Sequence, residues 1–129
     1  MSFLSGLRGM VSGRASLSEK WLQPEAEEDL DKMVAANSGK HVIYKHSYSC
    51  AVCLFSKLKV EEIMDKYDDR ASFHFVDVLK NRALSRKIAD MTGLRHESPQ
   101  IIVLNDGKVF WHESHSGISK EELEKAILS

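Results

Sequence analysis

The chain has 129 residues, a length typical of a single domain, and its 43% of hydrophobic residues is ordinary for a globular protein. Its 18 lysines and arginines nearly balance 19 aspartates and glutamates, and this net charge of −1 argues against a general nucleic-acid-binding protein, which needs a basic excess or a basic face. The longest apolar run, Cys50–Phe55, is far shorter than the roughly 20 residues of a membrane-spanning helix, so no membrane span is expected.

The first 20 residues differ from the rest of the chain. They contain three basic side chains, one acidic side chain and three glycines, and their apolar residues recur at helical spacing. We predict an N-terminal extension over residues 1–20 that frays, as termini commonly do, and a folded domain over residues 21–129. An organelle transit peptide and a surface-docking segment are the alternatives for the extension.

The domain is predicted to begin with a helix. Acidic residues follow Pro24 closely, and both proline and acidic side chains are favoured in the first turn of a helix. Gly39 is expected to end this helix. The hydrophobic periods that follow predict strands at His41–Lys45, Phe73–Val78, Ile101–Leu104 and Val109–Trp111, and helices over Leu54–Tyr67, over Leu84–Met91 and after Ser119.

Two local motifs support the later part of this pattern. Asp106-Gly107 favours a tight hairpin turn, because both residues accept the positive φ angles that such a turn needs. Ser119 and Glu122 match a capping box at the start of the last helix. We therefore predict an α/β protein with a mixed central sheet of about four strands flanked by helices. Its first strand–helix–strand unit should be a parallel right-handed crossover, and its hairpin antiparallel.

Both cysteines of the chain fall in one four-residue window, Cys50-Ala51-Val52-Cys53, between a predicted strand and a predicted helix. Unpaired N–H groups and the helix dipole favour an anion there, so the pKa of the Cys50 thiol should lie below the free value of about 8.5. The thiolate is the attacking species in disulfide exchange. Cys53 lies one helical turn later and can reach back to a mixed disulfide on Cys50. The window thus predicts a nucleophile and a resolving thiol.

Other interpretations of the cysteines stay open. A structural zinc site needs four ligands and a second Cys-x-x-Cys is absent; His112 and His115 could complete a set, but their spacing is shorter than usual, and no metal site is predicted. Two inert buried thiols are the other alternative. Lys45 and His46 could add positive potential that lowers the pKa of Cys50 further, or they could be ordinary residues at the end of a strand.

Ser98-Pro99 is the second informative pair. Proline fits only the first residue or the edge of a strand, and Pro99 directly precedes the apolar strand Gln100–Leu104. Because only about 5–6% of X–Pro bonds are cis, position alone predicts a trans peptide.

The order strand, Cys-x-x-Cys, helix, strand, helix, X-Pro, hairpin, helix resembles the thioredoxin fold. In that fold the proline before the third strand is cis and packs beside the active cysteines. The resemblance therefore implies a cis Ser98–Pro99 peptide and a Ser98 backbone that pairs with the substrate. The chain does not look like a thioredoxin proper, because it has Ser-Cys-Ala-Val-Cys in place of Trp-Cys-Gly-Pro-Cys and lacks the buried acid expected a few residues upstream.

A closer resemblance, from about Trp21 to the C-terminus, is to the YtxJ-type family, the monothiol bacilliredoxins. It is carried by Lys45-His46-Ser47 before Cys50, by Val76-Asp77-Val78, by His96-Glu97-Ser98-Pro99-Gln100, and by Trp111-His112 with Ser114-His115. The resemblance implies thiol–disulfide exchange with bacillithiol mixed disulfides in a bacterial cytoplasm. Bacillithiol would be a co-substrate, and no bound cofactor is expected.

One departure from this family bears on the mechanism. The family pattern is Cys-Pro-Ile-Ser, whereas this chain has Ala51 in place of the proline and Cys53 in place of the serine. Cys50 carries over as the attacking cysteine, and an internal Cys50–Cys53 disulfide becomes available. Both cysteines are therefore the predicted catalytic residues, and the predicted substrate-binding residues are Ser98, Pro99, Trp111 and His46.

The leading hypothesis is a thiol–disulfide oxidoreductase that takes bacillithiol from S-thiolated client proteins, with a flavoprotein reductase as a further candidate partner. The first alternative is a general dithiol reductase of thioredoxin type. The second is a non-catalytic thioredoxin-fold binding module whose cysteines are structural or hold zinc.

Overall fold

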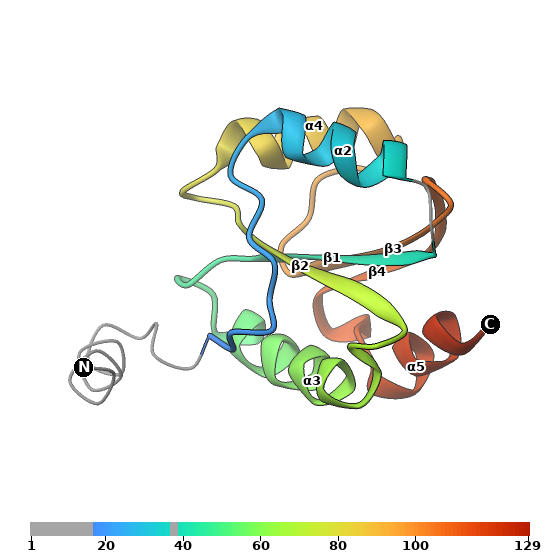
Figure 1. The fold of residues 1–129 in the computed structure, drawn as a ribbon. Helices are drawn as coiled ribbons and strands as arrows, with labels where there is room; N and C mark the ends of the chain where they lie inside the picture. Colours follow the sequence, from blue (N-terminus) through green and yellow to red (C-terminus); the bar gives the residue numbers. More distant parts are fainter. Residues whose placement is uncertain (1–16, 37–38) are drawn as a thin grey trace, which may run out of the picture.

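The computed structural model describes residues 17–36 and 39–129, so residues 1–16 of the predicted extension lie outside the described residues. Figure 1 shows one sheet with helices on both faces, which confirms the predicted α/β class. In the part of the chain that is described, no helix is long and apolar enough to cross a membrane. The elements in chain order are α2 (Glu27–Ala36), β1 (Lys40–His46), α3 (Ala51–Tyr67), β2 (Ala71–Asp77), α4 (Arg82–Thr92), β3 (Gln100–Asn105), β4 (Lys108–Ser114), the short 3-10 helix η1 (His115–Gly117) and α5 (Lys120–Leu128).

The sheet has four strands in the order β2-β1-β3-β4, as predicted for a mixed sheet. β1 and β2 are parallel and joined through α3, whereas β3 pairs antiparallel with both β1 and β4. Lys45 near the end of β1 lies opposite Gln100 at the start of β3. The loop that follows β1 and carries Cys50 therefore meets the loop that precedes β3 and carries Ser98 and Pro99.

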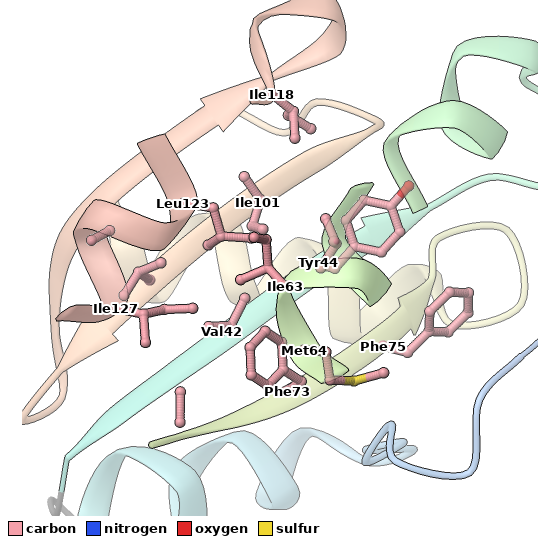
Figure 2. Packing of buried hydrophobic residues seen from close by; sticks show 14 of the residues in the cluster. Val42, Tyr44, Ile63, Met64, Phe73, Phe75, Ile101, Ile118, Leu123 and Ile127 are labelled. Carbon is pink, nitrogen blue, oxygen red and sulfur yellow. The ribbon is translucent and has the colours of Figure 1, made fainter. Parts of the chain in front are cut away.

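The side chains of β1 alternate between the two faces of the sheet, as the period of a strand requires. Val42 and Tyr44 are fully buried on the face covered by α3 and α5. Ile43 is fully buried on the opposite face, beneath α2 and α4. Figure 2 shows the first of these clusters, in which residues of three strands meet Ile63, Met64, Leu123 and Ile127 of the two helices.

The hairpin between β3 and β4 follows the sequence prediction. Asp106 and Gly107 have φ angles of 52° and 81°, as a mirror-image turn requires. Beyond the turn, the register of the two strands shifts between Val103 and Leu104, and Trp111 pairs with Val103. The shift is a β-bulge, and it sets which face of the sheet Trp111 joins.

The segment before α2 runs beside the sheet and α3. Trp21 is 4% exposed, and its indole N–H donates to Oε2 of Glu61 in α3 over 2.8 Å. Leu22 bonds through its backbone to β2, and Leu17 also packs against the cluster shown in Figure 2. The chain therefore contacts the domain a few residues before Trp21.

The structure corrects the predicted start of the first helix. α2 begins at Glu27, three residues after Pro24. The carboxylate of Asp29 accepts the backbone N–H groups of Glu25 and Ala26, each over 3.0 Å. These bonds fold the preceding residues as a turn, so Pro24 lies outside the helix.

Candidate active site

Cys50 lies at the junction between β1 and α3, where the sequence places it. Its backbone N–H donates to the carbonyl of Ser47 over 3.2 Å, which closes the turn after the strand. Cys50 is the N-cap residue of α3, with extended backbone angles (φ −110°, ψ 122°). The side chain of Cys50 therefore occupies the N-cap position. A side chain at this position faces the N–H groups of the first helical turn. The residue is partly exposed, so a substrate can reach it.

The first turn of α3 makes the two thiols unequal. The backbone N–H of Cys53 is the largest cause of a lowered pKa at Cys50, and the thiol of Cys53 and the N–H of Val52 add to it. Cys53 is fully buried, and burial raises the pKa of its thiol. Cys50 is therefore the thiol that ionises first, and Cys53 holds its proton at neutral pH.

Ser98 lies beside Cys53, and Pro99 follows it in the chain. Oγ of Ser98 is 3.7 Å from Sγ of Cys53, and Pro99 is buried. The Ser98–Pro99 peptide is cis, as the resemblance to the thioredoxin fold implies. The trans peptide expected from position alone is wrong. The general frequency of cis X–Pro bonds contains no information on how this loop packs.

Buried polar side chains hold residues 95–99 against β1. Nζ of Lys45 donates to Oε1 of Gln100 over 3.0 Å, and Nε2 of Gln100 donates to the carbonyl of Arg95 over 3.0 Å. Both Lys45 and Gln100 are at most 2% exposed. Because buried hydrogen bonds of this kind have little freedom to rearrange, they fix the loop relative to β1.

The same loop is also tied to η1. The backbone N–H of His115 donates to the carbonyl of Pro99 over 2.9 Å, and Nε2 of His115 lies 2.6 Å from Oε1 of Glu97. This hydrogen bond from His115 lowers the pKa of Glu97, so its carboxylate stays ionised. His115, weighed as a zinc ligand in the sequence, instead supports the loop that carries Ser98.

Lys45 and His46 do not lower the pKa of Cys50 as suggested from the sequence. Lys45 alternates with Tyr44 along β1 and faces away from α3; burial lowers its pKa to about 8. Burial lowers the pKa of His46 to about 4, so its ring is neutral at pH 7. That ring packs within 4.5 Å of the ring of Tyr48, and His46 is 2% exposed. Any role of His46 in substrate binding would act through shape and not through charge.

Tyr44 contacts the cysteine turn, and sequence reasoning missed it. Its place in a strand pattern indicates a core residue, and it is fully buried. Its hydroxyl donates to the carbonyl of Cys53 over 2.9 Å, and Nδ1 of His46 lies 3.1 Å from the same hydroxyl. Because a tyrosine has one hydroxyl proton, Nδ1 of His46 must be the donor in the second bond. Tyr44 thus ties the first turn of α3 to β1.

Trp111 lies farther along the sheet than the other predicted site residues. It belongs to β4, pairs with Val103 of β3, and packs against the cluster beneath α3 and α5. Its role in substrate binding stays a prediction. Within the described residues, no group of three or more histidine, cysteine, aspartate or glutamate side chains is placed to hold a metal ion.

Solved structures share this fold. A protein with a thioredoxin fold is 22% identical with a TM-score of 0.76, over 83% of this chain and 93% of that chain. Fasciola hepatica thioredoxin is 22% identical with a TM-score of 0.66, over 82% and 95% of the two chains. Mitochondrial thioredoxin 3 from Saccharomyces cerevisiae is 17% identical with a TM-score of 0.66, over 84% and 93%. At these identities the likeness shows the thioredoxin fold.

A family model described as monothiol bacilliredoxin BrxC matches residues 23–123. The match includes all four strands, the first turn of α3 and the loop with Ser98 and Pro99. This chain departs from the description in one respect, because Cys53 gives it a second thiol beside Cys50. The chain belongs to the monothiol bacilliredoxin family and is a thiol–disulfide oxidoreductase with a thioredoxin fold.

Proposed function

We propose that this protein removes bacillithiol from mixed disulfides on client proteins through Cys50, with Cys53 as the resolving thiol. The observation that carries the proposal is the asymmetry of the two cysteines. Cys50 is partly exposed and has a lowered pKa, whereas Cys53 is buried one turn later and has a raised pKa. The family match supports bacillithiol as the small thiol.

In the first step, the thiolate of Cys50 attacks the bacillithiol sulfur of the mixed disulfide. A bond forms between these two sulfurs, and the client sulfur leaves as a thiolate that takes a proton from water. Ser98 and Pro99 border the pair, and the Ser98 backbone is proposed to orient the incoming disulfide. Trp111 is the proposed further contact of the substrate, and His46, which is 2% exposed, is proposed to support the binding site through its contact with Tyr48.

In the second step, Cys53 loses its proton and attacks the sulfur of Cys50. Bacillithiol leaves as a thiolate, and a Cys50–Cys53 disulfide remains. The hydrogen bond to Cys50 and the charge of Cys50 both raise the pKa of Cys53, and both end when Cys50 enters a mixed disulfide. Formation of the first intermediate should therefore ease ionisation of the resolving thiol.

The two electrons that reduce the client come from the cysteine pair, so the reaction needs no bound cofactor. A further reductant must return the Cys50–Cys53 disulfide to two thiols, and a flavoprotein reductase is the candidate. S-thiolated proteins of a bacterial cytoplasm are the proposed clients. This setting follows from the family resemblance.

A trapping experiment tests the proposal. The Cys53→Ser variant, incubated with a bacillithiolated protein, should accumulate a bacillithiol adduct on Cys50 that mass spectrometry detects, because the second step is blocked. The matched Cys50→Ser variant should form no adduct. An adduct confined to residues other than Cys50 would refute the assignment.

The second cysteine also favours one alternative, a general dithiol reductase of thioredoxin type. Such an enzyme would reduce ordinary protein disulfides through the same pair. Turnover of a bacillithiolated protein should exceed turnover of an unmodified protein disulfide if the first proposal is correct. Equal rates would favour the alternative.

A further inference from the structure

A small cavity with basic walls lies beside the active-site loops. It has a volume of about 250 Å³, and its lining is Val78, Leu79, Arg82, Ser85, Arg86 and His96. Two of these side chains are arginines and none is acidic, whereas burial lowers the pKa of His96, so the positive charge of the cavity comes from the arginines. The proposed exchange chemistry between Cys50 and Cys53 does not use this cavity.

Neither arginine of the cavity forms a salt bridge in the part of the chain that the structure describes. No acidic residue occurs between Asp77 and Asp90. Within residues 17–36 and 39–129, no carboxylate forms a salt bridge with Arg82 or Arg86. Lys87 of the same helix, by contrast, pairs with Asp31 over 3.0 Å. Asp90, one helical turn after Arg86, lines a neighbouring cavity with it without forming a salt bridge, so both arginines can still pair with an anion from outside.

Their position in α4 makes this arrangement unfavourable for the protein alone. Arg82 is the first residue of α4, and the first turn of that helix contains no acidic residue. A positive side chain there opposes the helix dipole, which favours negative charge at this end. A bound carboxylate would satisfy both the arginines and the dipole.

The cavity and the cysteines lie at one end of the sheet. The backbone N–H of Val78 donates to the carbonyl of His46, the last residue of β1, over 3.0 Å. His96 precedes Ser98 by two residues, and Ser98 lies against Cys53. Figure 1 shows the loop after β1 and the loop after β2 at the same end of the sheet. A small molecule joined to Cys50 is therefore attached at the end of the sheet where the cavity lies.

His96 lines the cavity and forms a hydrogen bond with α4. Its Nδ1 lies 3.1 Å from Oγ of Ser85, a residue of α4 that is 4% exposed. This bond joins α4 to the loop that carries Ser98.

We propose that this cavity binds the carboxylates of the low-molecular-weight thiol whose sulfur reacts at Cys50, with Arg82 and Arg86 as its specificity-determining residues. Arginine suits this role because its planar fork binds a carboxylate through two parallel hydrogen bonds. Bacillithiol carries carboxylates on its malyl group. The inference rests on the proposed function for the identity of the thiol.

Direct binding tests the cavity without catalysis. S-methyl bacillithiol is titrated by calorimetry into protein in which Cys50 and Cys53 are both replaced by serine. Adding Arg82→Gln and Arg86→Gln should weaken binding about tenfold, the size expected for two exposed charge pairs. The control substitution Lys87→Gln removes a charge from the same helix and should leave the affinity unchanged. S-methyl glutathione is titrated as a second probe, because it derives from a different low-molecular-weight thiol that also carries carboxylates.

The outcomes separate this inference from the proposed function. Arginine-dependent binding of either probe supports the cavity, and the probe that binds more tightly identifies the thiol. Binding of neither probe, or binding that both arginine substitutions leave unchanged, overturns it. If the probe binds through the arginines but the wild-type protein fails to reduce a bacillithiolated client, the proposed function is wrong and the cavity stands.

Turnover gives the matching kinetic result. The Arg82→Gln, Arg86→Gln variant should show a raised KM for a client modified with bacillithiol. Its KM for the same client modified with 2-mercaptoethanol, which has no carboxylate, should equal that of the wild-type protein. An equal rise in KM for both clients would mean that the arginines act on the fold or on the client, and would contradict the inference.

Discussion

Replacement of Cys50 by serine should lower the turnover of bacillithiol mixed disulfides by at least about a thousandfold, because a hydroxyl of high pKa cannot replace the attacking thiolate. The loss should appear in kcat/KM, since the first bond to the substrate can no longer form. Cys50 is the partly exposed thiol of the pair, and the N–H groups of α3 lower its pKa. Cys53 cannot take over, because it is fully buried.

The matched Cys53→Ser variant should behave differently. It keeps the thiolate of Cys50 and should release the reduced client in a single turnover, then stop with bacillithiol attached. The two variants can be distinguished by quenching the reaction at set times. At each time, the amount of released client and the mass of the bacillithiol adduct on the enzyme are measured. Full turnover by the Cys50→Ser variant would show that another group is the nucleophile.

Acidification should destabilise the fold by several kcal/mol before the carboxylates titrate. Burial lowers the pKa of His46 and of His74 to about 4, well below the ordinary value of about 6.5. The unfolded chain therefore binds protons that the folded chain excludes. The contribution of these two histidines to stability is complete above about pH 6.5 and is lost as the pH drops towards 4, by at most about 1.4 kcal/mol per pH unit for each histidine.

Urea unfolding between pH 7.5 and 5 measures this dependence. His74→Gln should flatten the fall in unfolding free energy, because glutamine has no proton to gain and can still meet Nδ1 of His41, which lies 3.0 Å from Nε2 of His74. The exposed His112 provides the control, and His112→Gln should leave the slope as in the wild-type protein. An unchanged slope in His74→Gln would show that His74 does not carry the effect.

Much of the fold could be predicted because its signals are local. The alternation of apolar residues placed β1 and β3, Asp106-Gly107 placed the hairpin, and the capping residue Ser119 accepts the N–H of Glu122 over 3.1 Å as expected. The position of Cys50 at the start of α3 followed from the same periods. The cis Ser98–Pro99 peptide needed the resemblance to the thioredoxin fold, because no local signal predicts it.

The electrostatics of the site could not be predicted, because they depend on burial and on contacts between distant residues. Lys45 and His46 read as a positive pair in the sequence, yet one faces away from α3 and the other is neutral. Tyr44 reads as a core residue, and its hydroxyl nevertheless bonds to the turn that carries Cys53. Arg82 and His96 are 14 positions apart and share a cavity only because the chain folds α4 back towards the Ser98 loop.

The rate of Cys50 alkylation by iodoacetamide, measured against pH in the wild-type protein and in Cys53→Ser, tests the central claim most directly. The first turn of α3 should hold the midpoint of the Cys50 reaction below the free-thiol value of about 8.5 in both proteins, because the N–H groups that lower it belong to the backbone. Peptide mapping should show Cys50 modified before Cys53 in the wild-type protein. A midpoint at or above about 8.5, or earlier modification of Cys53, would contradict the claim that the first turn of α3 lowers the pKa of Cys50 and makes it the nucleophile.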